Sequence, residues 1–370
     1  MDSILNGLVT LIAFLLMLGL LVLVHELGHF FAAIRLGIKV DEFGIGFPPR
    51  ALVLFERNGV KYTINWLPIG GFVRFGGEGE TVYGVGSLSA APPWKKIIVL
   101  LAGPLMNLLL AIIISSAIFA INGVPTLLDG VEISNVYDRT PAQAAGFQNG
   151  DIILALNGQP IGQNPEIISA IADQNANKPI EALVQRGDQQ ITLLVTPGPW
   201  VAPDGREFTV GFGFMYGSHI TMSPVNPLTA LGHGINFTWQ TLKAFVFGLG
   251  QALGGLLGLN EPIEGGVTGI VGIARGTGEI IDRQGMVGFW QWTAFISLNL
   301  FLVNLLPIPA LDGSHIMFSL IEVVRRGKKI PPEREALVHA IGFMALMGLM
   351  LIITVADVAN WISGAPVLGQ

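Results

Sequence analysis

Four long stretches without a charged residue constrain the fold of this chain more than any other feature. At 1.5 Å per residue, about 20 helical residues cover the roughly 30 Å hydrocarbon core of a bilayer. Runs of about that length occupy residues 3–24, 97–121, 285–310 and 336–356, the last interrupted only by His339. The pattern predicts a polytopic α-helical membrane protein with four transmembrane helices.

The composition agrees with a membrane protein and excludes several kinds of chemistry. Only 12% of the residues are charged, about half the fraction usual in soluble proteins, and the mean hydropathy is +0.61. The sequence has no cysteine, which excludes disulfides, thiolate metal ligands and a cysteine nucleophile. A net charge of −6 gives no electrostatic basis for binding nucleic acid.

Two apolar stretches allow more than one interpretation. The N-terminal run has no basic start and is longer than the apolar part of a signal peptide, so we expect an uncleaved span. Residues 224–260 are apolar with one charge, Lys243, but they are rich in glycine. We favour a pair of interfacial amphipathic helices there over a fifth span.

The loop charges predict an orientation in the membrane. Thirteen of the 20 basic residues fall in the two shorter loops, between spans one and two and between spans three and four. By the positive-inside rule these loops are cytoplasmic, and both termini and the long segment between spans two and three are extracytoplasmic. A fifth span would break this pattern.

The segment His25-Glu26-Leu27-Gly28-His29 directly follows the first uncharged run. In a helix, residues four apart lie on one face, so His25 and His29 can bind one metal ion while Glu26 holds and deprotonates a water molecule. The alternative is that the three side chains only satisfy one another in a packed helix. Ionisable groups at membrane depth are costly, which favours the metal site.

A catalytic zinc ion needs a third protein ligand and an open position for water. Asp312 is the clear intramembrane carboxylate, and it lies about as far along the third span as His25 lies along the first. Pro307 and Pro309 must interrupt the helix just before it, which is tolerable only where the backbone lines a cavity. His315 is either a rival for the position of the third ligand or a partner that orients the ligands. The alternative for Asp312 is an ordinary aspartate at the end of a helix, outside the bilayer.

Three motifs together resemble one protein family. They are the H-E-L-G-H segment, Ala102-Gly103-Pro104-Leu-Met-Asn107 in the second span, and the N-L-L-P-I-P-A-L-D-G segment from Asn304 that ends the third. The chain resembles the site-2 protease family of intramembrane zinc metalloproteases (peptidase family M50), and within it the bacterial RseP-type branch with a PDZ insert.

The resemblance implies roles for individual residues. It implies His25, His29 and Asp312 as ligands of one zinc ion per chain, with Glu26 as general base. It also implies that the substrate contacts Asn304, Asn107, Gly44 and Gly46.

The loop between spans one and two contains short β-type runs separated by Gly, Pro and Asn-Gly. They predict a cytoplasmic-side, membrane-associated β-sheet. A sheet with no further role is one interpretation. The other, favoured by the resemblance for residues 44–47, is that an exposed edge pairs with an unwound substrate.

Residues 131–197 alternate strand and turn signals around Thr140-Pro-Ala-Gln-Ala-Ala-Gly146 and Gly150-Asp151-Ile-Ile-Leu-Ala-Leu-Asn157-Gly158. They resemble a single extracytoplasmic α+β PDZ domain, a fold that binds an extended peptide or a C-terminus by strand addition. A structural plug without a ligand is the alternative.

The expected organisation divides the chain into nine segments. The first four are 1–35 (first span with H-E-L-G-H), 36–96 (β-rich loop), 97–121 (second span) and 122–198 (PDZ domain). The others are 199–284 (strands and interfacial helices), 285–321 (third span with the Leu-Asp-Gly motif), 322–335 (cytoplasmic loop), 336–356 (fourth span) and 357–370 (extracytoplasmic tail).

We therefore expect a zinc endopeptidase of the bacterial cytoplasmic membrane that cuts transmembrane segments of single-span proteins near the cytoplasmic face. Anti-sigma factors and signal-peptide remnants are the expected substrates, with the PDZ domain gating access. The expected partners are these substrates, the lipid bilayer and a peptide in the PDZ groove, without nucleic acid. A non-catalytic PDZ-bearing scaffold with a structural metal is the alternative, and Glu26 argues against it because structural zinc needs no base.

Overall fold

The computed structural model describes residues 2–76, 86–203, 205–256 and 269–363, and the chain divides into two compact units. Unit 1 combines Met1–Ile121 with Asn226–Gln370, and unit 2 is Asn122–Val225. Unit 2 is thus inserted into the sequence of unit 1.

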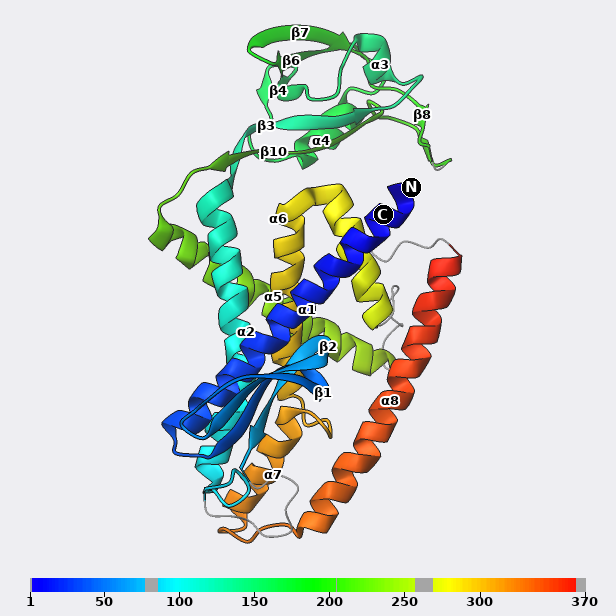
Figure 1. Ribbon diagram of the computed structural model, residues 1–370. Helices are drawn as coiled ribbons and strands as arrows, with labels where there is room; N and C mark the ends of the chain where they lie inside the picture. The colour runs from blue at the N-terminus through cyan, green and yellow to red at the C-terminus, as the bar shows by residue number, and fades with distance from the viewer. Residues whose placement is uncertain (1, 77–85, 204, 257–268, 364–370) are drawn as a thin grey trace. The chain divides into compact units, whose positions relative to one another are not determined.

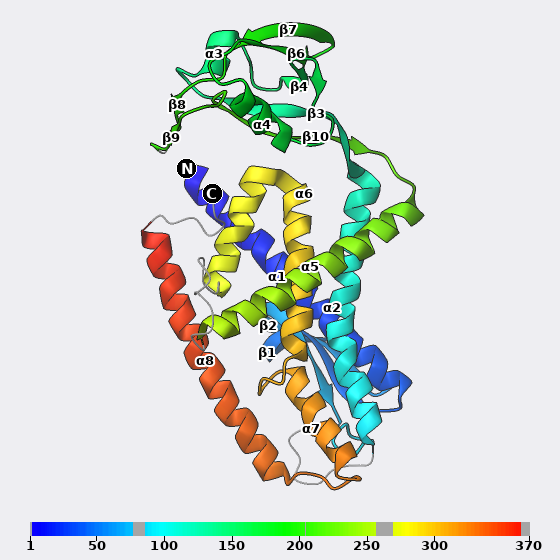
Figure 2. The ribbon, with the colours of Figure 1, turned by 180° about the vertical axis from the view of Figure 1, so that it is seen from behind.

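Unit 1 contains the long helices and a small antiparallel sheet (Figures 1 and 2). Its elements are α1 (Asp2–Arg35), β1 (Val40–Arg57), β2 (Val60–Phe75), α2 (Pro93–Asn122), α5 (Pro227–Leu256), α6 (Ile270–Leu305), α7 (Asp312–Val324) and α8 (Pro332–Ile362). Buried apolar side chains join α1 to α6, α2 to α6, and the sheet to α1 and α2.

Within the described residues, four helical segments are long and apolar enough to cross a membrane. They are Asn6–Arg35, Pro93–Asn122, Ile270–Leu305 and Glu333–Ile362, which confirms the four predicted apolar segments as helices. Many of their large apolar side chains point outward; in α8, for example, Met344, Leu351 and Ile352 are exposed. Exposed apolar surface of this extent suits lipid rather than water.

The third predicted span differs from the expected continuous segment 285–321. Helix α6 starts at Ile270, changes direction at Gly285 (φ 62°, ψ −150°) and ends at Leu305. A link without helical structure follows, and α7 begins at Asp312. As predicted, the helix stops before Pro307 and Pro309, because proline cannot donate a backbone hydrogen bond and its ring clashes with the preceding turn.

The segment between unit 2 and α6 corrects a second prediction. The described part of residues 224–260 contains one helix of 30 residues, α5, rather than a helix pair. Each glycine lowers the stability of a helix by only about 1 kcal/mol, so it does not end the helix. Proline would end it, and no proline follows Pro227 within α5. Residues 257–260 of the predicted pair, and residues 364–370 of the predicted tail, lie outside the described residues.

The short β-type runs of the predicted β-rich loop are joined in pairs into two long bent strands, β1 and β2. The first part of β1 has partners in both halves of β2: Gly44 aligns with Phe72 on one side and with Thr63 on the other. The two halves of β2 therefore lie on either side of residues 42–45 of β1. Residues 71–74 of β2 form one edge of this sheet, since no other described strand pairs with their outer side.

Unit 2 is an α+β domain with one main sheet. Its elements are β3 (Val124–Val136), α3 (Pro141–Ala145), β4 (Ile152–Leu156), β5 (Gln159–Pro160), α4 (Glu166–Gln174), β6 (Ile180–Arg186), β7 (Gln189–Val195), β8 (Trp200–Val201), β9 (Glu207–Phe208) and β10 (Phe214–Ser223). The main sheet has the order β10-β3-β4-β6-β7, with β5 beside β4, and β8 and β9 form a separate pair.

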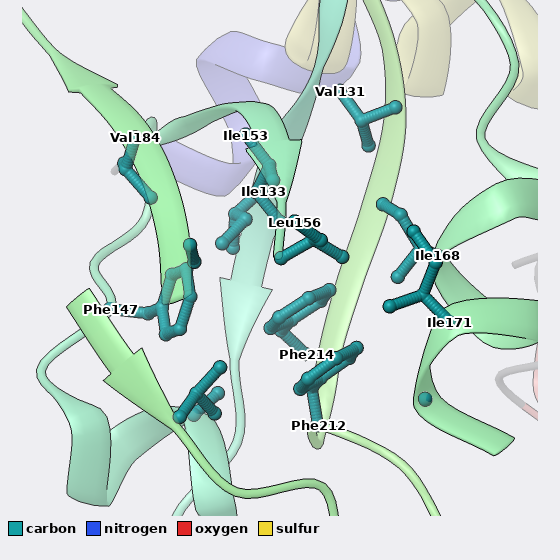
Figure 3. Close-up of a cluster of buried hydrophobic side chains, with 14 of the residues drawn as sticks. Val131, Ile133, Phe147, Ile153, Leu156, Ile168, Ile171, Val184, Phe212 and Phe214 are labelled. Atoms are coloured by element: carbon teal, nitrogen blue, oxygen red, sulfur yellow. The ribbon is translucent and has the colours of Figure 1, made fainter. Parts of the chain in front are cut away.

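The local structure of unit 2 follows its turn residues. Thr140 caps α3 through its side chain, and Gly146 ends that helix in the left-handed conformation at φ 85°. The core lies between the sheet and α4, where Ile168 and Ile171 pack against Leu156 and Phe214 (Figure 3).

The predicted end of this domain at residue 198 is too early. Strand β10 pairs with β3 along most of its length, so the unit continues to Val225. The two strands are far apart in the sequence, and local patterns do not reveal such a pairing.

Candidate metal centre

The two histidines of the H-E-L-G-H segment lie on one face of α1, one helical turn apart. The Nε2 atoms of His25 and His29 are 3.1 Å from each other, and the rings meet edge to face. Because α1 continues unbroken to Arg35, the helix places both residues on the same face.

Asp312 completes a cluster of three ligand-type side chains. Its Oδ2 atom is 3.1 Å from Nε2 of His25 and 3.4 Å from Nε2 of His29. Asp312 is the first residue of α7, so the break after α6 turns its side chain toward α1. The structure thus brings together the three residues predicted as metal ligands.

The spacing of these three atoms fits a zinc ion. Zinc bound at about 2.05 Å in a tetrahedral arrangement keeps its ligand atoms roughly 3.3 Å apart. The Nδ1 atom of His29 lies 2.8 Å from the carbonyl oxygen of Val99, which can only accept, so Nδ1 carries the proton and Nε2 keeps its lone pair. In the neutral imidazole a lone pair and a carboxylate oxygen then face each other at this distance, and they repel unless a proton or a metal ion lies between them.

Helix α2 provides a hydrogen-bond partner for the Nδ1 atom of each histidine. Besides the Val99 carbonyl, it contributes Asn107, whose Nδ2 atom is 3.3 Å from Nδ1 of His25. The Oδ1 atom of Asn107 is buried without a partner among the described residues, and a rotation of the amide would let it accept a hydrogen bond from the Nδ1–H of His25. Asn107 is itself held by Ser297, which donates a 2.8 Å hydrogen bond to its backbone carbonyl.

Glycines allow the helices to approach this closely. A β-carbon on Gly103 of α2 would overlap the imidazole of His29, and one on Gly28 of α1 would overlap the backbone of Ala102. The sequence reasoning found the motif around Gly103 but not this steric reason for it.

A cavity of about 710 Å³ contains the cluster and the predicted general base. It is lined by residues of α1, β2, α6, α7 and α8, including Glu26, Val73 and Asn304. The backbone of Val73 lies close enough to interact with the Glu26 carboxylate, and both residues line the cavity. Glu26, the three ligand-type residues and one sheet edge therefore share a single space.

Other predicted site residues lie elsewhere. Asn107 is fully buried behind His25 and so cannot contact a substrate in this structure. Gly44 is paired on both sides, so the prediction of a free edge there is wrong; the edge that reaches the cavity is residues 71–74. At Gly46 (φ 82°) a β-carbon would overlap the carbonyl oxygen of Leu67, which gives this glycine a structural role. His315 faces Glu335 in α8, with Nδ1 3.7 Å from Oε1, rather than the histidine pair.

The sheet is held by a charged network outside the predicted spans. The buried Glu42 carboxylate accepts hydrogen bonds from Arg50 Nε at 3.0 Å and Thr63 Oγ1 at 2.8 Å, and it pairs with Arg74 at 3.2 Å. Burial alone would raise the pKa of Glu42. The hydrogen bonds from Arg50 and Thr63 and the charges of Arg50 and Arg74 outweigh that effect and hold the pKa below its usual value.

Comparison with known proteins decides the family. The model of peptidase family M50 matches residues 13–349. The chain belongs to this family. The M50 assignment confirms the resemblance found in the motifs and the expectation of a metalloendopeptidase of the site-2 protease type.

The relatives of this M50 chain cover nearly its whole length. The regulator of sigma-W protease RasP of Bacillus subtilis (strain 168) is 31% identical over 94% of this chain and 98% of its own. A putative zinc metalloprotease of Clostridium perfringens is 32% identical over 93% and 97%, and the probable protease eep of Enterococcus faecalis 29% over 95% and 99%. Among solved structures, the PDZ domain of an SdrC-like protein from Listeria innocua aligns with 25% of the chain and 97% of that domain, with 24% identity and a TM-score of 0.21.

Proposed function

We propose that this M50 peptidase is a zinc-dependent intramembrane endopeptidase that cuts the transmembrane segments of single-span membrane proteins. His25, His29 and Asp312 hold one zinc ion per chain, and Glu26 is the general base. The observation that carries the proposal is the convergence of two imidazole nitrogens and one carboxylate oxygen within 3.1 to 3.4 Å in a cavity shared with Glu26.

The three ligand residues leave room for catalysis. Three protein ligands are typical of catalytic zinc sites, whereas structural sites use four. When bound, zinc polarises the scissile carbonyl and increases the acidity of water. Val99 and Asn107 orient the two imidazoles, and the α6–α7 break orients Asp312.

Glu26 moves the proton. It follows His25 directly in α1, and its carboxylate lies in the cavity, close to the backbone of Val73. Glu26 accepts a proton from the attacking water and donates it to the amide nitrogen that leaves when the peptide bond breaks. Both steps need only one carboxylate that faces the scissile bond.

The substrate enters as a strand along residues 71–74 of β2. A transmembrane helix hides its peptide groups in internal hydrogen bonds, so it must unwind before it can be cut. An added strand would receive the backbone hydrogen bonds of this edge, and Val73 would place it next to Glu26. Asn304 of α6 lines the same cavity and is available to bind the backbone or side chains of the substrate.

The four apolar helices cross the bacterial cytoplasmic membrane, with the basic loops on the cytoplasmic side. Both termini and unit 2 are then extracytoplasmic, and the active site lies near the cytoplasmic face. Unit 2 acts as a PDZ domain that limits access of substrates or binds a peptide. The Bacillus subtilis relative is named a regulator of sigma-W protease, which supports membrane-bound regulators such as anti-sigma factors as substrates.

Reconstitution tests the proposal. The full chain in liposomes with a model single-span substrate should contain one zinc per chain and cleave within the apolar segment. Removing zinc with a chelator should stop cleavage, and adding zinc should restore it. Asp312→Ala should lower both zinc content and cleavage. Full zinc content in this variant would contradict the ligand assignment, and cleavage unaffected by chelation would contradict the zinc mechanism.

A further inference from the structure

A second cluster of polar side chains lies beside the candidate zinc ligands and has no role in the function described so far. It consists of His315 in α7 with Glu335 and His339 in α8. The rings of His315 and His339 stack with centroids 4.0 Å apart, and all three residues line the same cavity as Glu26.

The residue types are those of a metal site, but the hydrogen bonding of His339 argues against one. The backbone N–H of Ala310 donates to Nδ1 of His339 at 3.1 Å. A neutral imidazole that accepts at Nδ1 carries its proton on Nε2, the atom that faces Glu335 at 4.0 Å. His339 therefore has no lone pair to offer a cation on that side while the bond to Ala310 is intact.

The same nitrogen contacts both sides of the segment that contains Asp312. Ala310 lies two residues before Asp312, and Ser314 lies two residues after it, with its hydroxyl oxygen 3.4 Å from Nδ1 of His339. Ser314 is fully buried and donates to the carbonyl oxygen of Leu311, which fixes the first turn of α7. One ring atom of α8 thus lies against the residues on both sides of a proposed zinc ligand.

The link before Asp312 needs such a contact. Ala310 has φ 77°, in the left-handed region that residues with a β-carbon seldom adopt, and this costs of order 1 kcal/mol or more unless the surroundings compensate. Helix α8 also packs closely on this link at Gly342, where a β-carbon would overlap the ring of Pro309. The ring of His339 is held in turn by His315 and by Phe318 at 5.4 Å.

We propose that His339 is a positioning residue for the zinc site: by accepting the Ala310 N–H it holds the link between α6 and α7 in the conformation that directs Asp312 toward His25 and His29. The inference rests on the proposed function, because it assumes that Asp312 is a zinc ligand. It assigns to α8 a part in building the metal centre, although α8 contributes no ligand to it. Loss of a partner that orients a ligand typically weakens metal affinity roughly 10- to 100-fold.

Zinc affinity of the full chain in detergent, measured by competition with a chelating dye, tests this role without relying on cleavage. His339→Phe keeps a ring in the stack but cannot accept the Ala310 N–H, and we expect at least a tenfold weaker affinity. His339→Asn keeps an acceptor near the position of Nδ1, and we expect it to stay within about threefold of the unaltered chain. His339→Leu serves as a second variant without an acceptor if the phenylalanine variant does not fold.

The outcomes separate this inference from the proposed function. Affinity unchanged in both variants without an acceptor would overturn the role of His339 while leaving the zinc site intact. An asparagine variant as weak as the phenylalanine variant would also overturn it, since ring packing would then be the cause. A second zinc equivalent that His315→Phe removes would show a metal site in the cluster and contradict the bond to Ala310. No zinc bound by the unaltered chain would instead contradict the proposed function.

Discussion

Gly103 of α2 faces the imidazole of His29 so closely that a β-carbon at this position would overlap its Nε2 atom and lie 2.9 Å from that of His25. The two atoms concerned are those proposed to bind zinc. Both imidazoles can therefore occupy their positions only because Gly103 has no side chain. The adjacent Pro104 and the nearby Asn107 belong to the same buried turn of α2.

Replacing this glycine should damage the metal centre selectively. We expect Gly103→Ala to weaken zinc binding at least tenfold, because the methyl group must displace one or both imidazoles. The measurement is zinc affinity by chelator competition. Gly19→Ala in α1 is a matched control, since nothing lies within 4 Å of the corresponding position there. Equal affinities in the two variants would contradict the packing of α2 against the histidines.

The ion pair between Lys96 of α2 and Glu322 of α7 should stabilise the part of unit 1 that holds Asp312. The two charged atoms are 2.9 Å apart and both side chains are largely buried. We expect Lys96→Met to lower the free energy of unfolding by about 3–5 kcal/mol, because it leaves a buried carboxylate without its partner. Thermal unfolding in detergent is the measurement. The double variant Lys96→Met, Glu322→Leu should regain most of the loss, and a double variant less stable than the single one would count against this explanation.

The edge of β2 should bind substrate through its backbone. Val73→Pro removes the backbone N–H close to Glu26, and edge positions tolerate proline when this amide faces away from the neighbouring strand. We expect kcat/KM for a single-span substrate to fall at least about tenfold, with zinc content unchanged. Val73→Ala, which keeps the amide, should retain most of the activity. Full activity of the proline variant would show that neither substrate pairing at this edge nor the support of Glu26 depends on the Val73 amide.

Acid should weaken the β1–β2 sheet through Glu42. Its pKa is lowered in the folded chain, so the ionised form stabilises the fold; this contribution is complete above the ordinary carboxyl pKa and is lost as the pH falls through the lowered value. We expect the unaltered chain to be more stable than Glu42→Gln at neutral pH and this difference to shrink in acid. Unfolding temperatures of both proteins across a pH series measure it. A difference that does not depend on pH would mean that the charge of Glu42 is not the cause.

Local spacing and membrane depth were sufficient to predict much of the candidate site. His25 and His29 come together because a helix repeats every 3.6 residues, and this follows directly from the sequence. Asp312 was expected at the depth of His25 because the sequence pattern predicts that both spans run in the same direction. The prolines before it also predicted the break between α6 and α7, which the structure has at residues 306–311.

Contacts between distant segments were beyond the reach of such reasoning. The fully buried position of Asn107 depends on the packing of α2 against α1, and the double pairing of Gly44 depends on how β2 bends around β1. The bond from Ala310 to His339 joins segments 29 residues apart. In each case the residue type could be read from the sequence, but its partner is determined by tertiary structure.

The substitution Glu26→Gln tests the central claim most directly. The amide keeps the shape of the side chain but cannot accept a proton, so cleavage of a single-span substrate in liposomes should fall by at least about 100-fold. The zinc content should remain that of the unaltered chain, because His25, His29 and Asp312 are unchanged. Cleavage at the original rate in a variant with full zinc content would contradict the account of Glu26 as the general base of an intramembrane zinc peptidase.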